Sequence, residues 1–159
     1  MKKILLFSVL AIFLNSCTVE VRIDGCTDPI AYNYDSQADD DDGSCSYTAD
    51  VVFYLDAAGA LYFTHVEEIE ELWVYVEGVE IDYLDASTAF DYIPSCYPID
   101  VDAVNFSYEW DDALAATFTW MVVDEYDVVH YEGTDVIGAN DCLPMELTFK
   151  KIQEYKASK

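Results

Sequence analysis

Val104-Asn105-Phe106-Ser107-Tyr108-Glu109-Trp110 is the stretch of this chain that decides its fold. Large apolar side chains occupy every second position of it, and polar side chains occupy the positions between them. Successive side chains of a β-strand point to opposite faces of a sheet, so this alternation predicts a strand with one buried face and one exposed face. Residues 117–122 repeat the pattern, with Phe118, Trp120 and Val122 on one face.

Short apolar segments bounded by turn residues predict further strands on both sides of this stretch. They cover residues 51–55, 60–64, 72–76, 79–83, 128–131 and 145–149. Glu77-Gly78 predicts a tight hairpin, and Asp56-Ala57-Ala58-Gly59 predicts a turn. We therefore expect an all-β fold, an antiparallel β-sandwich of the immunoglobulin or fibronectin kind with about seven strands, over residues 47–150. Residues 151–159 are polar and partly basic, which predicts a flexible C-terminal tail.

The N-terminal residues have the pattern of an export signal. Two basic residues, Lys2 and Lys3, precede an apolar run over residues 4–14 and the sequence Leu14-Asn15-Ser16-Cys17. The run is too short for a membrane-spanning helix, which needs about 20 apolar residues, and it is typical of a secretory signal. Leu14-Asn15-Ser16-Cys17 resembles the lipobox of bacterial lipoproteins. The resemblance implies cleavage before Cys17, removal of residues 1–16 and acylation of Cys17.

The lipobox resemblance also carries an expectation about location. More than one acyl chain on Cys17 would give stable membrane attachment. Thr18 is not the aspartate that lipoproteins often carry when they stay in the inner membrane. We therefore expect an outer-membrane protein anchored by lipid, on either the periplasmic or the cell-surface face, with residues 17–24 as a tether.

The charge of the mature chain is large and one-sided. Loss of the leader with Lys2 and Lys3 leaves 5 Lys and Arg against 32 Asp and Glu, a formal charge of −27. Between Arg22 and Lys150 there are 30 carboxylates and no Lys or Arg. Nucleic acids and anionic lipid surfaces are excluded as partners, because both require positive charge at the contact. Disorder is excluded as well, since 53% of the residues are hydrophobic.

Four cysteines remain once Cys17 is assigned to lipid. An even number in an exported chain predicts two disulfides, and four cysteines allow three pairings. The short-range choice pairs Cys26 with Cys45 and Cys96 with Cys142.

Residues 25–46 contain a cysteine-bounded, Asp-rich motif. It reads Gly25-Cys26-Thr27-Asp28-Pro29-Ile30-Ala31-Tyr32-Asn33-Tyr34 and closes with Asp39-Asp40-Asp41-Asp42-Gly43-Ser44-Cys45. It resembles the motif GCTDPxAxNYxPxAxxDDGSC of secreted and surface proteins of marine Gram-negative bacteria, although Ser36 stands where that family has proline. The resemblance supports the Cys26–Cys45 pair and an extracytoplasmic location, and it implies no particular activity. We expect a small disulfide-closed loop module ahead of the sandwich.

The aspartate run of this motif raises the question of a calcium site, because calcium prefers several closely spaced oxygen ligands. An ordinary EF-hand is excluded, since Ala38 and Ala49 occupy its first and twelfth ligand positions. A looser calcium site with Asp39, Asp41 or Asp42 remains as an alternative to a solvated turn.

No catalytic motif is present in the sequence. His65 and His130 are the only imidazoles, and we expect both at exposed strand or loop positions. Carboxylate pairs are too frequent in this composition to indicate a glycosidase. The tryptophans either fill the core or line a binding face; they are Trp73, Trp110 and Trp120.

The sequence therefore predicts a lipid-anchored cell-envelope protein without catalytic activity, with no cofactor other than the calcium considered above. We expect it to act as a binding or structural accessory with a protein or carbohydrate partner. Two alternatives stay open: a calcium-dependent adhesion or spacer module, and a carboxylate-based hydrolase.

Overall fold

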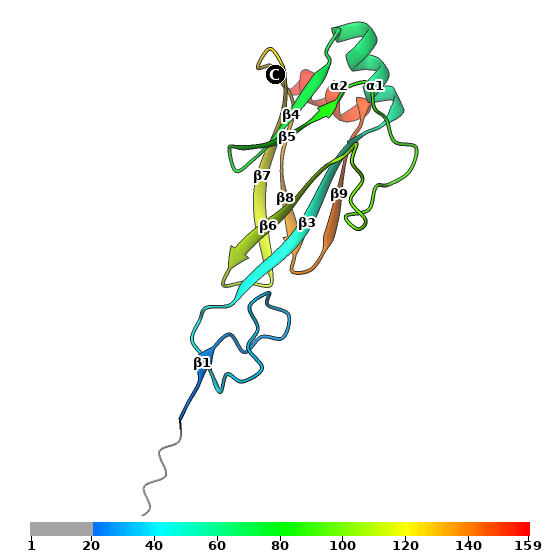
Figure 1. Cartoon of the computed structure of the whole chain (residues 1–159). Helices are drawn as coiled ribbons and strands as arrows, with labels where there is room; N and C mark the ends of the chain where they lie inside the picture. The colour runs from blue at the N-terminus through cyan, green and yellow to red at the C-terminus, as the bar shows by residue number, and fades with distance from the viewer. Residues whose placement is uncertain (1–20) are drawn as a thin grey trace, which may run out of the picture.

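A computed structural model describes residues 21–159 and contains a β-sandwich with a small disulfide-closed module at one end (Figure 1). The elements in chain order are β1 (Asp24–Gly25), β2 (Asp40–Asp41), β3 (Ser46–Leu55), α1 (Ala57–Tyr62), the π-helix η1 (Phe63–Glu67), β4 (Glu71–Val76), β5 (Val79–Asp85), β6 (Val104–Asp111), β7 (Ala115–Asp124), β8 (Val129–Gly138), β9 (Cys142–Leu147) and α2 (Phe149–Ser158).

The sandwich consists of a three-stranded sheet in the order β6-β3-β9 and a four-stranded sheet in the order β5-β4-β7-β8. The prediction of an all-β sandwich of about seven strands is confirmed. The alternating residues 104–110 lie in β6, which pairs with β3 from Val104↔Phe53 to Asp111↔Ser46. The second alternating stretch lies inside β7, between β4 and β8.

One strand pair departs from the antiparallel prediction. β3 and β9 are parallel, in register from Asp50↔Cys142 to Leu55↔Leu147. The strand before β9 in the chain, β8, belongs to the other sheet. β9 therefore crosses between the sheets after β8, and it runs in the same direction as β3. A parallel pair needs such a distant connection, because a tight hairpin joins only antiparallel strands.

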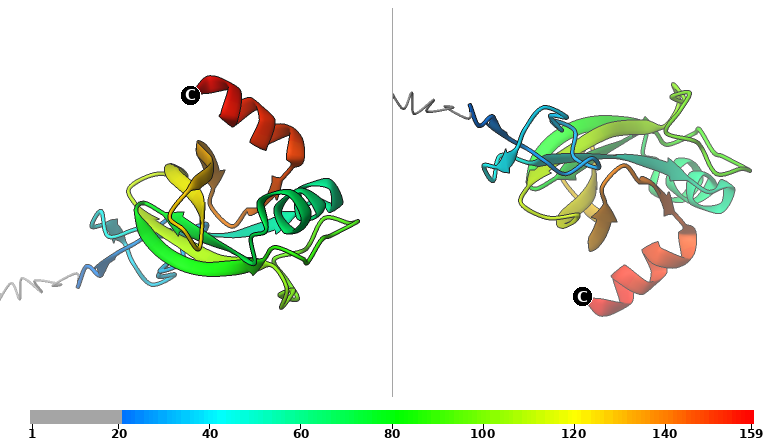
Figure 2. Two further views of the ribbon diagram at one scale, coloured as in Figure 1. Left: turned by 90° about the horizontal axis from the view of Figure 1, so that it is seen from above. Right: turned by 90° about the horizontal axis from the view of Figure 1, so that it is seen from below.

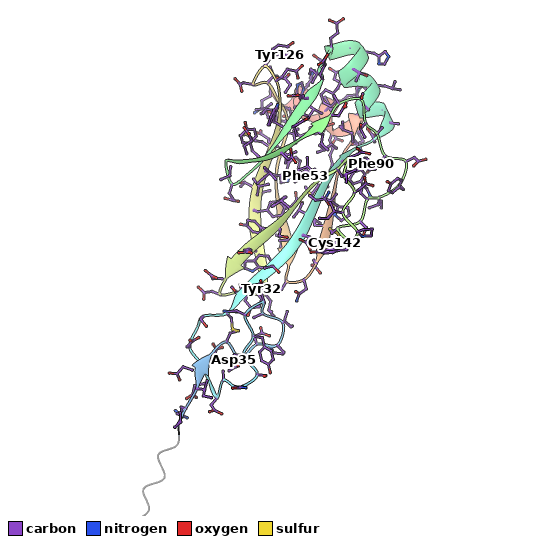
Figure 3. All side chains as sticks on the ribbon, viewed as in Figure 1. Tyr32, Asp35, Phe53, Phe90, Tyr126 and Cys142 are labelled. Carbon is purple, nitrogen blue, oxygen red and sulfur yellow. A yellow bond between two sulfur atoms is a disulfide. The ribbon has the colours of Figure 1, made fainter. Side chains whose placement is uncertain are left out.

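The core lies between the two sheets and contains the predicted alternating residues (Figure 3). Phe53 is fully buried, with its ring centroid 5.5 Å from that of Trp120 and 6.3 Å from that of Phe106. Trp120 extends across β8, where Gly133 stands opposite it in the register and leaves room for the indole.

We expect the substitution Gly133→Ala to destabilise the sandwich by about 1–3 kcal/mol, as overpacking of a core does. A Cβ at this position would lie 2.7 Å from Cζ2 of Trp120, whose ring is packed between the sheets. Gly138→Ala in the same strand is the matched control, because its Cβ would meet only the carboxylate end of the exposed Asp141 side chain, which can turn toward solvent. Chemical denaturation followed by tryptophan fluorescence measures both losses, and equal losses would contradict this account.

β3 is buried on both faces, which explains its uninterrupted apolar run. Val52 and Tyr54 point away from the sandwich core, yet both are buried. Residues 86–103, here called the covering loop, lie over this outer face (Figures 1 and 3). The backbone N–H of Phe90 donates to the carbonyl of Leu55 at 3.0 Å, and the Phe90 ring packs edge-on against Tyr54.

The predicted strand at residues 60–64 is wrong, because residues 60–62 belong to α1 and residues 63–64 belong to η1. Asp56 caps the helix: its Oδ1 accepts from the N–H of Gly59 at 2.6 Å. Ser, Thr, Asp and Asn are strongly favoured at this position, and Ala and Leu are good helix formers. Residues 56–59, for which the sequence predicts a turn, are therefore the N-cap and first turn of α1.

The predicted flexible tail is also wrong, because residues 149–158 form α2 (Figure 2). The Thr148 hydroxyl caps this helix by accepting from the N–H of Lys151 at 3.2 Å. Ile152 is buried in the core cluster, and Phe149 packs against Tyr62 with ring centroids 5.0 Å apart. These apolar anchors fix a helix whose remaining residues are mostly polar.

The module is docked on the end of the sandwich where β3 begins. The backbone N–H of Tyr32 donates to the carbonyl of Ser46 at 2.8 Å, and Asn140 Nδ2 donates to the carbonyl of Ile30 at 3.1 Å. The Tyr47 hydroxyl donates to Asp28 Oδ2 at 2.8 Å. A small buried cluster lies at the contact between module and sandwich. It contains Cys26, Ala31, Cys45 and Tyr47, with Trp110 and Ala139 packed against it.

Candidate binding surface

Both predicted disulfides are present, which confirms the short-range pairing. Cys26–Cys45 closes the module, with a sequence separation of 19. Cys96–Cys142 joins the covering loop to the start of β9, with a separation of 46. Three of these cysteines are buried, namely Cys26, Cys45 and Cys96.

The predicted lipidation site, Cys17, lies outside the described residues, as does the leader that precedes it. Of the predicted tether, Asp24 already belongs to β1, which pairs with β2 inside the module. Within residues 21–159, no helix is long and apolar enough to cross a membrane.

The predicted calcium ligands do not converge on one point. Asp41 Oδ1 accepts from the N–H of Gly43 at 3.0 Å, and Asp42 Oδ1 accepts from the N–H of Ser44 at 2.9 Å. The hydrogen bonds from Ser44 hold the pKa of Asp42 below its usual value. In the part of the chain that the structure describes, no three His, Cys, Asp or Glu side chains, Asp39 included, gather as a metal would require. The oxygens of this run instead stabilise a turn around Gly43.

The prediction that His130 is exposed is wrong. His130 and Asp124 are both buried, and His130 Nε2 lies 2.8 Å from Asp124 Oδ2. Asp124 Oδ1 also accepts from the N–H groups of Tyr126 and Val128 at 2.8 and 2.9 Å. The pair therefore holds the β7–β8 turn, whose tip carries Tyr126 (Figure 3).

The Asp124–His130 pair is enclosed by the fold, with His130 and Asp124 only 2% and 4% exposed. The edge of the His130 ring packs on Phe63, with ring centroids 5.0 Å apart, and Nδ1 has no partner among the described residues. The other imidazole, that of His65, is exposed as predicted and lies 2.8 Å from the Thr64 hydroxyl. His65 is therefore an exposed residue on the surface of η1.

The three tryptophans divide between the core and the surface. Trp120 is in the core, and its Nε1 donates to Asp135 Oδ2 at 2.7 Å. Trp110 is half-buried at the module junction, stacked against Tyr47 and Tyr108. Trp73 is half-buried and packs on the exposed Tyr83, with ring centroids 5.1 Å apart.

An acidic hollow of about 580 Å³ lies beside Tyr83, between η1 and the ends of β4 and β5. Four carboxylates line it: Glu68, Glu70, Glu71 and Asp85. Hydrogen bonds from the hydroxyl and the N–H of Ser87 lower the pKa of Asp85, which is the direction opposite to that required of a general acid. The carboxylate of Glu125 accepts from the N–H groups of Glu70 and Glu71 and braces this wall.

A group of exposed apolar side chains lies on the covering loop. Five of its large side chains are turned to solvent, and we call them the loop patch: Tyr92, Ile93, Tyr97, Ile99 and Val101. Two hollows, of about 390 and 170 Å³, meet at Ile99. The first is lined by Tyr92, Ser95, Pro98, Asp100 and Val101, and the second by Asp50, Cys96, Tyr97, Asn105, Phe106 and Ser107.

Carboxylates surround the loop patch. The Tyr92 hydroxyl donates to Asp100 Oδ2 at 2.5 Å. This bond and the negative charges of Asp100, Asp91 and Asp102 raise the pKa of Tyr92. The Asp50 carboxylate raises the pKa of Tyr97 in the same way, first through a hydrogen bond and then through its charge. The loop patch therefore combines apolar side chains with carboxylates that form no ion pair with Lys, Arg or His within residues 21–159.

Sequence reasoning missed the loop patch, because residues 92–101 have neither strand alternation nor a catalytic motif. A detectable signal was the high content of Tyr, Ile and Val in a segment interrupted by Pro94 and Pro98. Turn-rich loops seldom carry so many large apolar residues unless some of them are covered. No protein-family model, curated protein or solved structure matches this chain.

Proposed function

We propose that this protein is a lipid-anchored component of the bacterial outer membrane whose β-sandwich serves as a non-catalytic binding or structural accessory. The anchor is the acylated Cys17 implied by the lipobox resemblance, and the disulfides are consistent with an oxidising compartment outside the cytosol. In this proposal residues 17–23 tether the module to the membrane, and the sandwich carries the partner.

The observation that carries the proposal is the position of the docked module. The chain enters the module at the end of the molecule opposite to α1 and the start of α2 (Figure 1). Hydrogen bonds from Tyr32 and Asn140 and the Tyr47 contact with Asp28 join the module firmly to the sandwich. A lipid attached ahead of residue 21 would therefore hold the sandwich away from the membrane, with its sides open to a partner.

The use of the chemistry-bearing side chains supports a non-catalytic role. Asp124 and His130 are buried and stabilise a turn. The aspartates at 41 and 42 cap backbone N–H groups, and the pKa of Asp85 is shifted away from the value that an acid catalyst needs. Exposed apolar side chains on a braced loop fit a binding role better, since binding residues are often found on loops positioned by a rigid scaffold.

The anchor is tested by the substitution Cys17→Ser in a Gram-negative host. We expect the wild-type chain to enter the detergent-rich phase on phase separation and to carry acyl groups by intact mass, because two or more acyl chains give stable membrane attachment. We expect the variant to lose both properties. Thr18→Ser is the control, since it leaves the cysteine in place. An unmodified residue 17 in the wild-type protein would refute the anchoring part of the proposal.

A further inference from the structure

We propose that the loop patch binds an extended segment of a partner protein in which Lys or Arg side chains lie beside apolar ones. This inference rests on the binding role proposed above and names the surface and the chemistry of the partner. It is carried by the exposure of the patch, by the charge around it, by a lysine site within the chain itself, and by the bracing of the loop.

The exposure of the patch indicates a contact surface. Tyr97 is 71% exposed and Val101 is 90% exposed, while neighbouring residues of the same loop, Phe90 and Cys96, are buried against β3 and β9. The covering loop therefore has an inner face that belongs to the core and an outer face that is also apolar. Ile99 lines both hollows, together with Val101 in one and Tyr97 in the other, so these side chains form one surface. Exposed apolar patches rimmed by polar residues mark interaction sites.

The charge around the patch selects the partner. Asp100 accepts a hydrogen bond from the Tyr92 hydroxyl, Asp91 and Asp102 are its neighbours in the same loop, and Asp50 lines one hollow with Tyr97. There is no Lys, Arg or His between His65 and His130 in the sequence. A second copy of this chain docked through the same patch would bring the same carboxylates into contact, and like charges disfavour such a contact. A partner with positive charge removes this repulsion and gains attraction.

The hydroxyl donors at the patch are already engaged. Tyr92 donates to Asp100, and Ser107 donates to Asp50. The groups that can still form hydrogen bonds with a partner are the carboxylate oxygens, which accept hydrogen bonds and form the strongest ones with charged donors. An ammonium or guanidinium group supplies such donors, and its aliphatic stem can lie along Ile99 and Val101.

The chain itself holds a lysine with the same pair of groups. The Tyr62 hydroxyl donates to Glu67 Oε1, and Lys156 Nζ lies 2.6 Å from that oxygen and 5.0 Å from the centroid of the Tyr62 ring. The hydrogen bond from Lys156 is the main cause of the lowered pKa of Glu67. Tyr92 and Asp100 form the corresponding tyrosine–carboxylate pair on the loop patch. A ring face next to a carboxylate attracts a cation by both charge and cation–π interaction.

The loop patch is also preorganised. Cys96–Cys142 ties the loop to β9, and Asn105 Nδ2 donates to the carbonyls of Asp100 and Ala103 at 3.0 and 2.9 Å. The bond from the Phe90 N–H to Leu55 holds the other end of the loop. A surface that is fixed before binding loses less conformational entropy on association.

The test uses the full chain in detergent micelles and a short blocked peptide in which lysine alternates with leucine. Calorimetric titration compares it with the same peptide carrying glutamine in place of lysine, and with a neutral glucan oligosaccharide. We expect binding of the lysine peptide alone, weakened by salt, because exposed charge pairs are screened over about 10 Å at 0.1 M ionic strength.

Matched variants separate the loop patch from the general negative field. Asp91→Asn with Asp102→Asn removes two exposed charges at the patch, and Glu68→Gln with Asp127→Asn removes two exposed charges outside the patch, next to η1 and in the β7–β8 turn. Ile99→Thr is matched by Val136→Thr on β8, since the two side chains are 61% and 64% exposed. We expect each patch variant to weaken lysine-peptide binding at least about five-fold, and each control to change it less than about two-fold.

The outcomes are decisive in both directions. Equal losses from patch and control variants would show that the peptide follows the overall charge, and this would overturn the inference. Binding of the glutamine peptide or of the glucan with similar affinity would overturn it too, because the recognised partner would then be neutral. Loss of acylation in the Cys17 experiment would refute the anchor and leave these titrations unaffected, so the two failures are distinguishable.

Discussion

Replacement of His130 by alanine is expected to lower the free energy of unfolding by about 3–5 kcal/mol, because it leaves a buried carboxylate without its charged or hydrogen-bonding partner. His130 and Asp124 are only 2% and 4% exposed, and their side chains meet at 2.8 Å. The substitution also opens a space against Phe63, whose ring packs on the imidazole. Denaturant unfolding followed by circular dichroism measures the loss.

The expected loss depends on pH through Asp124. Burial opposes ionisation of this carboxyl, but hydrogen bonds from His130 and from two backbone N–H groups outweigh burial, so its pKa lies below the usual 3.8. A carboxyl with a depressed folded-state pKa stabilises the fold fully above its unfolded pKa, and this contribution disappears as the pH falls through the folded pKa. We therefore expect the difference between the wild-type protein and His130→Ala to be largest near neutral pH and to narrow below about pH 4.

His65→Ala is the matched control for this prediction, since His65 is the other imidazole of the chain and is exposed. Exposed substitutions usually change stability by less than about 0.5 kcal/mol. A His130→Ala variant as stable as His65→Ala, or a difference that widens in acid, would contradict the assignment of the buried pair to fold stability.

Removal of the Cys96–Cys142 disulfide by serine substitutions is expected to cost about 4 kcal/mol in the chain-entropy model, because it closes the longer of the two loops. The two cysteines are 46 residues apart in sequence, and their bond holds the covering loop over Val52 and Tyr54 of β3. We expect the loop to become sensitive to protease and to lose its affinity for the lysine peptide. Pulse proteolysis and the titration described above measure these effects.

Removal of Cys26–Cys45 is the comparison, with an expected cost of about 3 kcal/mol for the shorter loop. This bond lies in the module, whose buried cluster is distinct from the sandwich core, although Trp110 packs against both. We expect amide hydrogen exchange to rise in residues 25–45 and to stay slow in β3, β4 and β7. Exchange that rises equally in both parts would show that module and sandwich form one cooperative unit.

The sequence by itself determined the fold class, because alternating side chains dictate which face of a strand is buried. Val104–Trp110 and the residues around Phe118 are strands for this reason, and the core is built from their apolar positions. The pairing of the disulfides was also accessible, since four cysteines allow only three pairings and the short-range one is present.

Only the tertiary structure decided the features that depend on contacts between distant segments. Asp124 and His130 are six residues apart, but their burial follows from packing against Phe63, which no local pattern reports. The helices at 57–62 and 149–158 form because apolar anchors such as Ile152 reach the core from the end of the sandwich. The loop patch exists because the covering loop buries one apolar face on β3 and leaves the other in solvent. Alternation along a chain shows which residues share a face, whereas the segment that covers this face is chosen by the three-dimensional packing.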